Sequence, residues 1–577
     1  MLVIRTTTLK QLLTTRLLPL TPVRHSRRTL AIMAQEYKLK GLVTLDLPTG
    51  FKQEAEVEGI EGAKVLVVSA AGKVSAIGAK CTHYGAPLVK GVLTADGRVT
   101  CPWHGACFNA ATGDVEDAPA FEPLNTYPLS AKDGSVYITA TEAAIKAFSR
   151  ASNAACTAKD AASAPGVVIV GGGSGALGAV DGLRQHGYTG SVTVVSNEGY
   201  LPIDRPKLSK ALITDVAKIT LRDQAWYDAG NVKWVTDQVA SVDFAARSVS
   251  TADGTSIPYS KLVLATGGTP RQLPLPGFDT LSNVFTLRTA ADTKKITDAI
   301  GPDGGKKVVI VGSSFIGMEV ANATLKNNSV TVIGMEKVPL ERVLGEQVGA
   351  AVQASLEKKG ITFHMNASVD SASDGAILLK DGTKLPADVV ILGVGVSPAT
   401  EYLQGNAGIT LEKDGSVKTD AHFLVDGHKD VYAVGDIATY PYRGPVGGSE
   451  SGSNTKYTRI EHWNVAQNAG RTAATHIVDP SRAPANFIPV FWSALGAQLR
   501  YCGNSAPSVG GWDDVVVHGD LDALKFVAFY TSDNVVVSAA SMGMDPYVMQ
   551  TAELMRTNKM ATKDMLQAGY DLLSISP

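Results

Sequence analysis

The sequence predicts a protein of mixed β and α/β class, with a small all-β domain in front, two interleaved α/β domains behind it and an α+β domain at the C-terminus. Residues 37 to about 140 contain short strand-like runs separated by Gly- and Asp-rich turns, which is typical of an antiparallel β domain. The runs 167–170 and 307–311 each lead into a glycine-bearing turn, a helix and a second strand. From about residue 487 the composition changes again, and alternating runs such as 525–529 indicate a separate lobe.

The length, charge and cysteine content limit the class of protein. A chain of 577 residues is too long for one hydrophobic core, and we expect about three or four domains. Lys+Arg 53 against Asp+Glu 55 leaves no basic footprint for nucleic acid. Five cysteines, two of them in a metal-ligand spacing, argue against a disulfide framework. No stretch has the roughly 18–20 uninterrupted apolar residues of a membrane span, so we expect a soluble protein without a transmembrane segment.

The first 34 residues differ from the rest of the chain. They are rich in Arg, Thr and Leu and contain no acidic residue before Glu36. A cationic, hydroxylated and acid-free leader is typical of a mitochondrial transit peptide, which predicts a mitochondrial protein. Initiation at Met33 would instead leave a cytoplasmic one.

Two short motifs contain the candidate metal ligands. Cys81-Thr82-His83 and Cys101-Pro102-Trp103-His104 each supply one thiolate and one imidazole from a loop. In a Rieske 2Fe–2S centre, two Cys hold one iron and two His hold the other. A structural zinc site is the alternative, but zinc fingers usually pair Cys with Cys and His with His at short spacing. The pattern therefore favours a Rieske cluster on Cys81, His83, Cys101 and His104.

The residues around these ligands, CTHYGAPL and CPWHGACFNAATGDVEDAP, resemble Rieske ferredoxin domains over roughly residues 37–140. Ala86 and Trp103 stand where the respiratory type has an extra disulfide, and Ala106 and Phe108 where it has hydroxyl side chains. Fewer hydrogen bonds to the cluster sulfurs should place the potential at the low end of the Rieske range, roughly −150 mV. Such a cluster is suited to accept electrons from a flavin.

The first glycine turn predicts a dinucleotide site. Gly171, Gly173 and Ala176 fit the pattern G-x-G-x-x-(G/A), in which the backbone approaches a pyrophosphate at a helix N-terminus. Glu198 follows the next strand and is placed to bind ribose hydroxyls. A second strand–turn–helix unit of this kind predicts two Rossmann-like dinucleotide-binding domains in one chain.

The second turn has Gly312 and Gly317 in the matching places, but Ser314 replaces the middle glycine. Glu336 follows the second strand of this unit. An acidic residue there normally selects NAD by binding the 2′-hydroxyl, so we expect NADH to be favoured over NADPH. Arg342 is too far along the chain for the sequence to assign it a part.

Three further segments match a known family. Residues 202–210, 264–267 and 431–436 resemble the FAD-dependent pyridine-nucleotide reductases, most closely the ferredoxin-reductase and apoptosis-inducing-factor group. With the Rieske motifs in front, the chain resembles the Rieske-bearing branch of the apoptosis-inducing-factor family over about residues 37–570. The chain lacks a C-x₄-C dithiol after the first glycine turn, so a disulfide reductase is not expected.

The resemblance implies roles for particular residues. Lys210 and Glu319 would form an ion pair beside the flavin N5, and Trp463 would border the isoalloxazine, which makes these three the candidate catalytic residues. Further residues expected at the FAD are Arg205, Thr266, Gly267, Gly435 and Asp436. The implied domain limits are 35–140 for the Rieske domain, 141–165 for a linker, 166–290 and 421–485 for the FAD-binding domain, 291–420 for the NAD(P)H-binding domain and 486–577 for an interface domain.

The expected activity is hydride transfer from NAD(P)H to FAD, then single-electron steps to the chain's own cluster and on to an unknown acceptor, which could be a protein. FAD is the converter between two-electron and one-electron carriers. The family resemblance also implies an alternative, a redox-linked cell-death signal with slow NADH oxidation. Both a monomer and a homodimer are compatible with the sequence.

Overall fold

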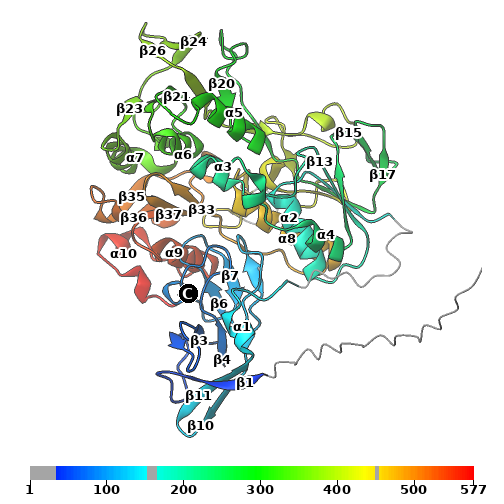
Figure 1. Cartoon of the computed structure of the whole chain (residues 1–577), viewed down its shortest axis with the longest axis vertical. Coiled ribbons are helices and arrows are strands. Elements are labelled where there is room, and N and C mark those ends of the chain that lie inside the picture. The colour runs from blue at the N-terminus through cyan, green and yellow to red at the C-terminus, as the bar shows by residue number, and fades with distance from the viewer. Residues whose placement is uncertain (1–33, 153–164, 449–453) are drawn as a thin grey trace, which may run out of the picture.

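The computed structural model describes residues 34–152, 165–448 and 454–577 of the chain (Figure 1). The predicted transit peptide up to residue 33 and the part 153–164 of the predicted linker lie outside the described residues. The all-β domain, the two α/β domains and the C-terminal α+β lobe are all present, which confirms the predicted fold class. Within the described residues, no helix combines the length and the apolar composition that a membrane span requires.

The N-terminal domain consists of three small antiparallel sheets. The basal sheets have the orders β1-β11-β10 and β2-β3-β4-β9, and the sheet β5-β6-β7-β8 stands between them and the rest of the molecule (Figure 1). The strands are β1 (Gln35–Leu39), β2 (Lys52–Glu56), β3 (Lys64–Ala70), β4 (Lys73–Gly78), β5 (Val92–Leu93), β6 (Arg98–Thr100), β7 (Cys107–Asn109), β8 (Val115–Asp117), β9 (Thr126–Tyr127), β10 (Leu129–Lys132) and β11 (Ser135–Ala140). The short helix α1 (Glu142–Lys146) follows.

The first α/β unit is a parallel sheet of order β14-β13-β12-β18-β30. Its strands are β12 (Val167–Val170), β13 (Val192–Ser196), β14 (Val232–Thr236), β18 (Lys261–Leu264) and β30 (Val431–Ala433). Their apolar runs are buried, as expected for a parallel sheet covered on both faces. Strand β30 comes from beyond the second α/β unit, so the chain leaves this sheet and returns to it.

Two helices of this unit pack backbone to backbone. They are α2 (Ser174–Gln185) and α8 (Trp463–Val478). A Cβ on Gly178 would lie 2.2 Å from the Gln467 carbonyl oxygen, and one on Gly470 would lie 2.1 Å from that of Gly175. Only glycine permits this approach, which fixes the first residues of both helices on either side of the same cavity. The shorter helices of the unit are α3 (Pro206–Ala211) and α4 (Gln224–Ala229).

The second α/β unit repeats the design with a parallel sheet of order β20-β27-β21-β22-β23. Its strands are β20 (Val284–Thr286), β21 (Lys307–Val311), β22 (Ser329–Ile333), β23 (Ile361–His364) and β27 (Val389–Leu392). Its helices are α5 (Ala290–Ile300), α6 (Phe315–Thr324) and α7 (Glu341–Glu357).

Each α/β unit carries a three-stranded antiparallel sheet, and two shorter sheets complete this part of the chain. The three-stranded sheets are β15 (Val239–Asp243), β16 (Ser248–Thr251) and β17 (Ser256–Pro258) in the first unit, and β24 (Val369–Ser373), β25 (Ala376–Leu379) and β26 (Lys384–Pro386) in the second. The remaining strands are β19 (Gly268–Pro270), β28 (Val396–Pro398), β29 (Val417–Lys418), β31 (Ala438–Pro441) and β32 (Tyr457–Thr458).

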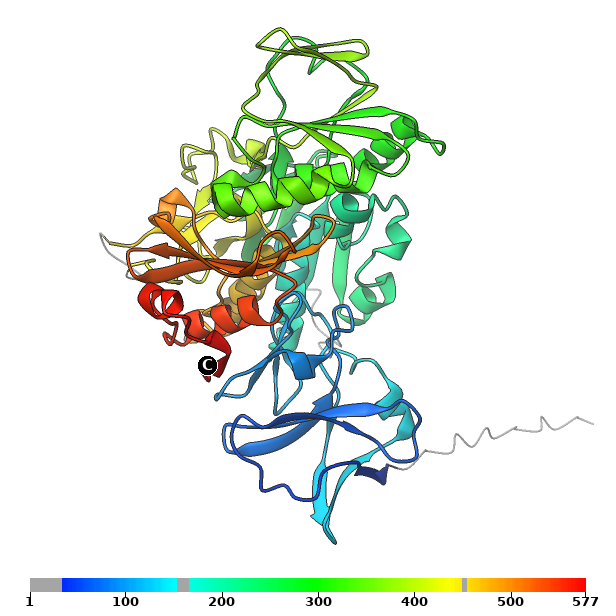
Figure 2. The same ribbon diagram turned by 90° about the vertical axis from the view of Figure 1, so that its left-hand side faces the viewer.

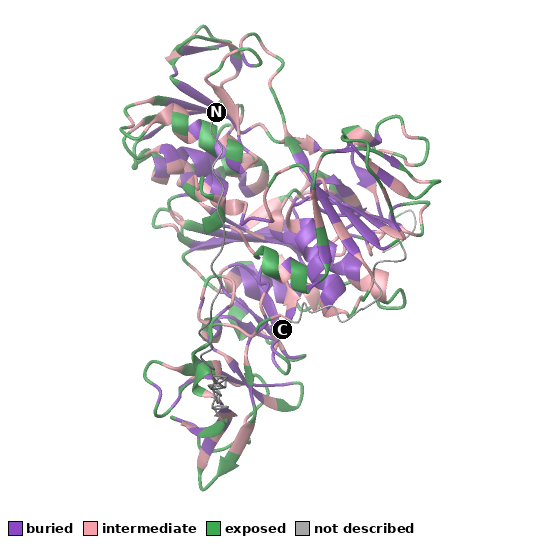
Figure 3. Ribbon diagram, turned by 45° about the vertical axis from the view of Figure 1, so that its right-hand side comes forward, coloured by how far each residue is buried: buried purple, intermediate pink, exposed green. Residues whose placement is uncertain are grey.

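The C-terminal lobe is an antiparallel sheet of order β33-β34-β37-β36-β35 with two helices. Its elements are β33 (Val490–Ala494), β34 (Gln498–Gly503), β35 (Asp514–Asp520), β36 (Lys525–Ser532), β37 (Val535–Met542), α9 (Tyr547–Arg556) and α10 (Lys563–Gln567). Figure 2 shows this lobe, in orange and red, between the second α/β unit and the N-terminal domain, and Figure 3 shows that the sheets of the α/β units and of the lobe are largely buried.

Buried hydrogen bonds link the N-terminal domain to the lobe and to α8. The Thr100 hydroxyl donates to Glu553 Oε1 at 2.7 Å, and the Ala118 amide donates to Asn468 Oδ1 at 2.8 Å. A Cβ on Gly105 would lie 3.1 Å from Val490 Cγ1, so this glycine sits directly against the lobe. The loop that carries Cys101 and His104 is therefore held against strand β33.

Candidate functional site

The four predicted metal ligands lie on two loops with the same backbone hydrogen bonds. The Cys81 amide donates to the Ala86 carbonyl at 2.8 Å, and the Cys101 amide donates to the Ala106 carbonyl at 2.8 Å. Each loop turns on a glycine with a left-handed φ, +77° at Gly85 and +75° at Gly105. Residues with side chains are strained there, which explains why each His is followed within two residues by glycine.

The two loops bring like ligands together. The Nδ1 atoms of His83 and His104 are 3.1 Å apart, and the thiols of Cys81 and Cys101 interact directly. Within the described residues, no group of three or more His, Cys, Asp or Glu side chains is placed to hold a single ion. A pair of sulfurs beside a pair of ring nitrogens is the donor set of a Rieske 2Fe–2S cluster, so these residues fit that group.

Burial keeps both histidines neutral. It is the largest cause that lowers the pKa of His83 to about 4, and together with His83, Arg500 and Lys210 it lowers that of His104 to about 2. A neutral imidazole has a free ring nitrogen, which is the form that binds a metal. Burial therefore favours the metal-binding form of both histidines.

A series of aromatic rings leads away from His104. Its ring centroid lies 4.3 Å from that of Trp492 on β33, and Trp492 lies 5.5 Å from His462 and 6.4 Å from Trp463. His462 and Trp463 begin helix α8 and line the large cavity of the first α/β unit. The candidate cluster and this cavity are thus separated by one layer of aromatic side chains.

The cavity has a volume of about 800 Å³ and lies at the carboxyl ends of β12, β13 and β18, where open α/β sheets bind nucleotides. The predicted residues that line it are Gly171, Gly173, Glu198, Arg205, Lys210, Thr266, Gly267, Glu319, Gly435, Asp436 and Trp463. Ala176 lies behind the glycine turn, 1% exposed in helix α2, and does not line the cavity. The structure therefore brings nearly all the predicted FAD residues together.

The glycine turn leaves room for a phosphate. A Cβ on Gly171 would lie 2.3 Å from the Ala265 carbonyl oxygen, so this glycine is required by packing. A Cβ on Gly173 would meet no atom within 4 Å and would instead project into the cavity. In addition, Trp463 Nε1 is buried and has no hydrogen-bond partner among the described residues. An open backbone cradle and an unpaired donor both fit a bound dinucleotide.

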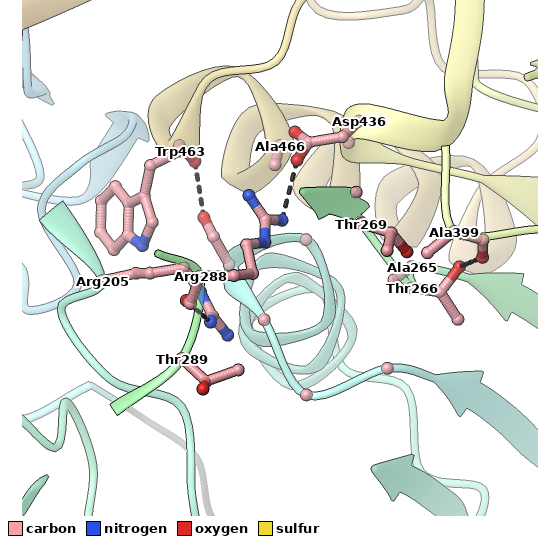
Figure 4. A pocket seen from close by; sticks show the side chains of 18 of the residues that line it. Arg205, Ala265, Thr266, Thr269, Arg288, Thr289, Ala399, Asp436, Trp463 and Ala466 are labelled. Carbon is pink, nitrogen blue, oxygen red and sulfur yellow. Dashed lines mark hydrogen bonds and ion pairs between the residues drawn. The ribbon is translucent and has the colours of Figure 1, made fainter. Parts of the chain in front are cut away.

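Charged side chains surround the cradle in pairs. Arg205 Nη2 lies 2.7 Å from Glu198 Oε2, and Arg288 Nη2 lies 2.8 Å from Asp436 Oδ2. Figure 4 shows Arg288 and Asp436 pointing toward each other across the N-terminus of α2. Guanidinium groups suit a pyrophosphate and carboxylates suit sugar hydroxyls, so both halves of a dinucleotide find partners here.

The ion pair that the family resemblance implies is present. Lys210 Nζ lies 2.9 Å from Glu319 Oε1, and the Glu319 side chain is only 4% exposed. The hydroxyls of Ser209 and Ser493 also donate to the Glu319 carboxylate. Three donors compensate the burial of this charge, so the ammonium of Lys210 is held at the cavity wall. What this pair does to a flavin stays a prediction.

The predicted residues of the second dinucleotide unit lie outside the large cavity. Gly312 has a φ of +106°, and a Cβ on Gly317 would lie 2.2 Å from the Gly312 carbonyl oxygen, so both glycines are required by the backbone. Neither these glycines nor Glu336 lines the large cavity. Phe315, at the start of α6, does reach that cavity together with Glu319.

The sequence leaves the role of Arg342 open, and the structure places its Nε 2.8 Å from Glu336 Oε1. The physical reason is the turn before α7, where Leu340 adopts a left-handed conformation with φ of 63°. This turn brings the first residues of α7 back over the end of β22. The acidic residue of the second unit therefore already has a cationic partner.

The sequence did not reveal two charged residues of the site. Arg288 lies outside every recognised motif and becomes visible only through its contact with Asp436. Arg500 on β34 is the cross-strand partner of Trp492, is 5% exposed and interacts electrostatically with Cys101. Arg500 is far from the cluster loops in the sequence, and the pairing of β33 with β34 brings it close to them. The sequence alone therefore gives no sign of this contact.

The comparisons with known proteins agree with this geometry. Residues 165–470 match the family described as pyridine nucleotide-disulphide oxidoreductase, and residues 42–128 match the Rieske [2Fe-2S] domain. Apoptosis-inducing factor 3 of Homo sapiens is 37% identical over 529 residues, which cover 90% of this chain and 84% of that protein.

Similar proteins are also found among bacterial reductases. The ferredoxin–NAD(+) reductase component of the anthranilate 1,2-dioxygenase system of Burkholderia cepacia is 33% identical, and the match covers 66% of this chain and 92% of that one. The solved covalent putidaredoxin reductase–putidaredoxin complex superposes with a TM-score of 0.63 at 28% identity, covering 70% of this chain and 95% of that chain.

Fold and site together define a flavin-dependent pyridine-nucleotide oxidoreductase that contains its own Rieske 2Fe–2S domain. FAD, a Rieske cluster and NADH are its cofactors and substrate. The chain belongs to the Rieske-bearing branch of the apoptosis-inducing-factor family, within the pyridine nucleotide-disulphide oxidoreductases.

Proposed function

We propose that the chain is a ferredoxin reductase fused to its own ferredoxin, which oxidises NADH and supplies single electrons to a separate acceptor protein. When bound, FAD accepts a hydride as two electrons, and the 2Fe–2S cluster takes and gives electrons one at a time. The observation on which the proposal rests is the ring series His104–Trp492–Trp463, which joins the cluster loops to the dinucleotide cavity. The bacterial reductases above are named for a ferredoxin partner, which supports the same reading.

Particular residues would perform the supporting tasks. Gly173, Arg205 and Arg288 would hold the FAD pyrophosphate, and Asp436 would bind the sugar end. The Lys210–Glu319 pair would hold a positive charge where negative charge develops as hydride arrives. Glu336 would bind the adenosine ribose of NADH in the second unit.

The decisive experiment is anaerobic addition of NADH to the purified protein, followed by visible absorption and electron paramagnetic resonance. We expect the flavin to bleach and the Rieske signal to appear in the same molecule. A cluster that stays oxidised while all four ligands hold iron refutes the proposal. Stopped-flow measurement of Trp492→Leu should show slower cluster reduction with normal flavin reduction.

A matched control separates this effect from general damage. Trp512 lies in the same lobe, against Tyr530 and Gly345, and belongs to no ring series toward the cavity. Trp512→Leu removes an equally large side chain and should leave the rate of cluster reduction unchanged. Trp492→Phe keeps an aromatic ring and should restore most of the rate.

Two finer proposals rest on narrower support. The acid-free leader before Glu36 supports a mitochondrial location, which a fusion of residues 1–34 to a fluorescent protein tests directly.

The name of the human relative supports a second function, a cell-death signal with slow NADH oxidation. If Cys81→Ser or Lys210→Ala protein still causes cell death, signalling is independent of electron transfer.

A further inference from the structure

The two cluster histidines have different nearest ring neighbours. His104 is 5% exposed and packs on Trp492, on the side of the dinucleotide cavity. The ring of His83 instead stacks on Tyr84, with centroids 3.8 Å apart and an interplanar angle of 16°. Tyr84 is 40% exposed. His83 also lies 5.7 Å from Trp492, and Tyr84 lies 5.4 Å from His104. Tyr84 is thus the ring through which the cluster ligands reach the surface of the molecule.

Tyr84 is held rigidly in this position. Its hydroxyl donates to the carboxylate of Asp204, whose side chain is 4% exposed. Lys207 Nζ lies 3.1 Å from the same carboxylate and 5.1 Å from the centroid of the Tyr84 ring. His83 stacks on the ring and the Lys207 ammonium lies near it, and the exposed 40% of Tyr84 is what a partner can reach.

A second exposed aromatic side chain lies close to the same loop. Phe148 is 52% exposed, and its Cε2 would be 3.9 Å from a Cβ on Gly85, the residue after Tyr84. Tyr84 and Phe148 form what we call the Tyr84–Phe148 surface. Aromatic side chains are enriched in the cores of protein interfaces, and exposed ones next to each other mark contact sites.

An exposed ammonium group, that of Lys207, lies next to Tyr84 at this surface. The Lys207 side chain is 37% exposed, whereas the carboxylate that pairs with it is buried. An approaching protein therefore meets the ammonium group before the carboxylate, which favours a partner with acidic groups at its contact face. A flat small molecule gains little here, because His83 already stacks on the Tyr84 ring.

We propose that a one-electron carrier protein with an acidic contact face docks on the Tyr84–Phe148 surface, with the Tyr84 ring as the contact between His83 and the carrier. This inference rests on the proposed function and names its acceptor class. Each docking oxidises the protein by one electron and reduces the carrier by one, so two carriers balance one NADH. The Trp492 side stays packed throughout, and the N-terminal domain does not have to leave the lobe.

The test uses the full-length protein with both cofactors and two haem proteins as probes, acidic cytochrome b5 and basic cytochrome c. Binding of each probe to the oxidised protein is measured by calorimetry at low salt, which requires no turnover. We expect cytochrome b5 to bind and Phe148→Ser to weaken its binding by about tenfold. Lys207→Glu should lower the rate constant for reoxidation by cytochrome b5 by about tenfold and remove its salt dependence.

Tyr84 itself is tested by two variants. Tyr84→Leu should slow reoxidation of the reduced cluster by cytochrome b5, and Tyr84→Phe, which keeps the ring, should restore the rate. Electron paramagnetic resonance of each variant shows whether the cluster is intact. If the Tyr84→Leu protein loses the cluster, the Phe148→Ser variant tests the docking surface instead, because Phe148 lies against Gly85, which is not a cluster ligand.

The outcomes separate this inference from the proposed function. If NADH does not reduce the cluster in the wild-type protein, the proposed function fails. If NADH reduces it but Phe148→Ser and Lys207→Glu bind and reduce cytochrome b5 as the wild type does, only the docking surface fails. Equal binding of cytochrome b5 and cytochrome c contradicts the acidic partner.

Discussion

The two dinucleotide units share one sequence pattern, and their acidic residues are similarly buried, but the arginine partners of these residues differ in exposure. In the first unit Glu198 pairs with Arg205, and the side chains are 16% and 19% exposed inside the large cavity. In the second unit Glu336 pairs with Arg342, whose side chain is 75% exposed. The buried pair suits a cofactor that stays bound, and the open pair suits a substrate that must leave after each turnover.

The glycine turns differ in the same sense. Gly173 leaves its backbone open to the cavity. Ser314, in the matching place, caps helix α6 by accepting a hydrogen bond from the Gly317 amide and donates to the Gly393 carbonyl at 2.8 Å. The hydroxyl stabilises the turn, and its side chain would lie near the phosphates of a dinucleotide bound at this turn. The first turn is therefore optimised for binding and the second partly for helix stability.

The largest effect should follow from filling the first turn. Gly173→Val places a branched side chain where the FAD pyrophosphate would lie, while no protein atom within 4 Å opposes its Cβ. We expect a folded protein that is purified without FAD but keeps its Rieske signal. Flavin fluorescence after denaturation gives the FAD content, and electron paramagnetic resonance of the dithionite-reduced sample gives the cluster content.

The matched control is Ser314→Val in the second unit. It removes the α6 cap, which costs about 1 kcal/mol, but it should leave the FAD content unchanged. Equal FAD loss in both variants would contradict the assignment of the two units to different dinucleotides.

A smaller effect is expected for the ion pair between the units. Glu319→Gln leaves the Lys210 ammonium without its anion in a largely buried place, and breaking such a pair typically costs about 3–5 kcal/mol. We expect a lower free energy of unfolding and a slower reduction of the flavin by NADH. Denaturant unfolding and stopped-flow absorption measure the two.

The double variant Lys210→Met/Glu319→Gln tests whether the effect belongs to the pair. Its loss of stability should be smaller than the sum of the single losses, because no unpaired charge is left behind. Additive losses would show that the two side chains act separately.

The open pair of the second unit should govern the choice of dinucleotide. Glu336→Ala removes the group that would bind the 2′-hydroxyl and frees Arg342 for a 2′-phosphate. We expect kcat/KM for NADH to fall about tenfold, equivalent to about 1.4 kcal/mol, while that for NADPH rises. Arg342→Ala should keep the preference for NADH. A ratio of the two kcat/KM values that does not change in Glu336→Ala argues against this role.

Local patterns were predictable from the sequence, and long-range contacts were not. The cluster ligands follow from the spacing within two loops, and the strands β12 and β21 follow from apolar runs that end in glycine. Lys210 and Glu319 could be paired only through the family resemblance, because nothing in either segment specifies the other. The contact between Trp492 and His104 requires the packing of two domains, which no local rule describes.

Arg342 shows a different limit. The sequence leaves its role open, because the contact with Glu336 depends on a single left-handed residue, Leu340. A leucine rarely adopts this conformation, so the sequence gives no sign of the turn. Such backbone exceptions are set by the surrounding packing, and Leu340 is indeed buried.

The smallest effect is expected when the second turn is made like the first. Ser314→Gly loses the hydroxyl cap, but glycine at this position costs only a few tenths of a kcal/mol. In return the backbone can approach the NADH pyrophosphate as closely as Gly173 would approach that of FAD, so we expect a slightly lower Kd for NADH and slower release of NAD⁺. Equilibrium titration of the oxidised protein with NAD⁺ and denaturant unfolding measure the two terms. An unchanged Kd for NAD⁺ together with a lower free energy of unfolding would mean that the phosphates already reach the α6 N-terminus when Ser314 is present. The two turns would then differ in sequence but not in how they bind a dinucleotide.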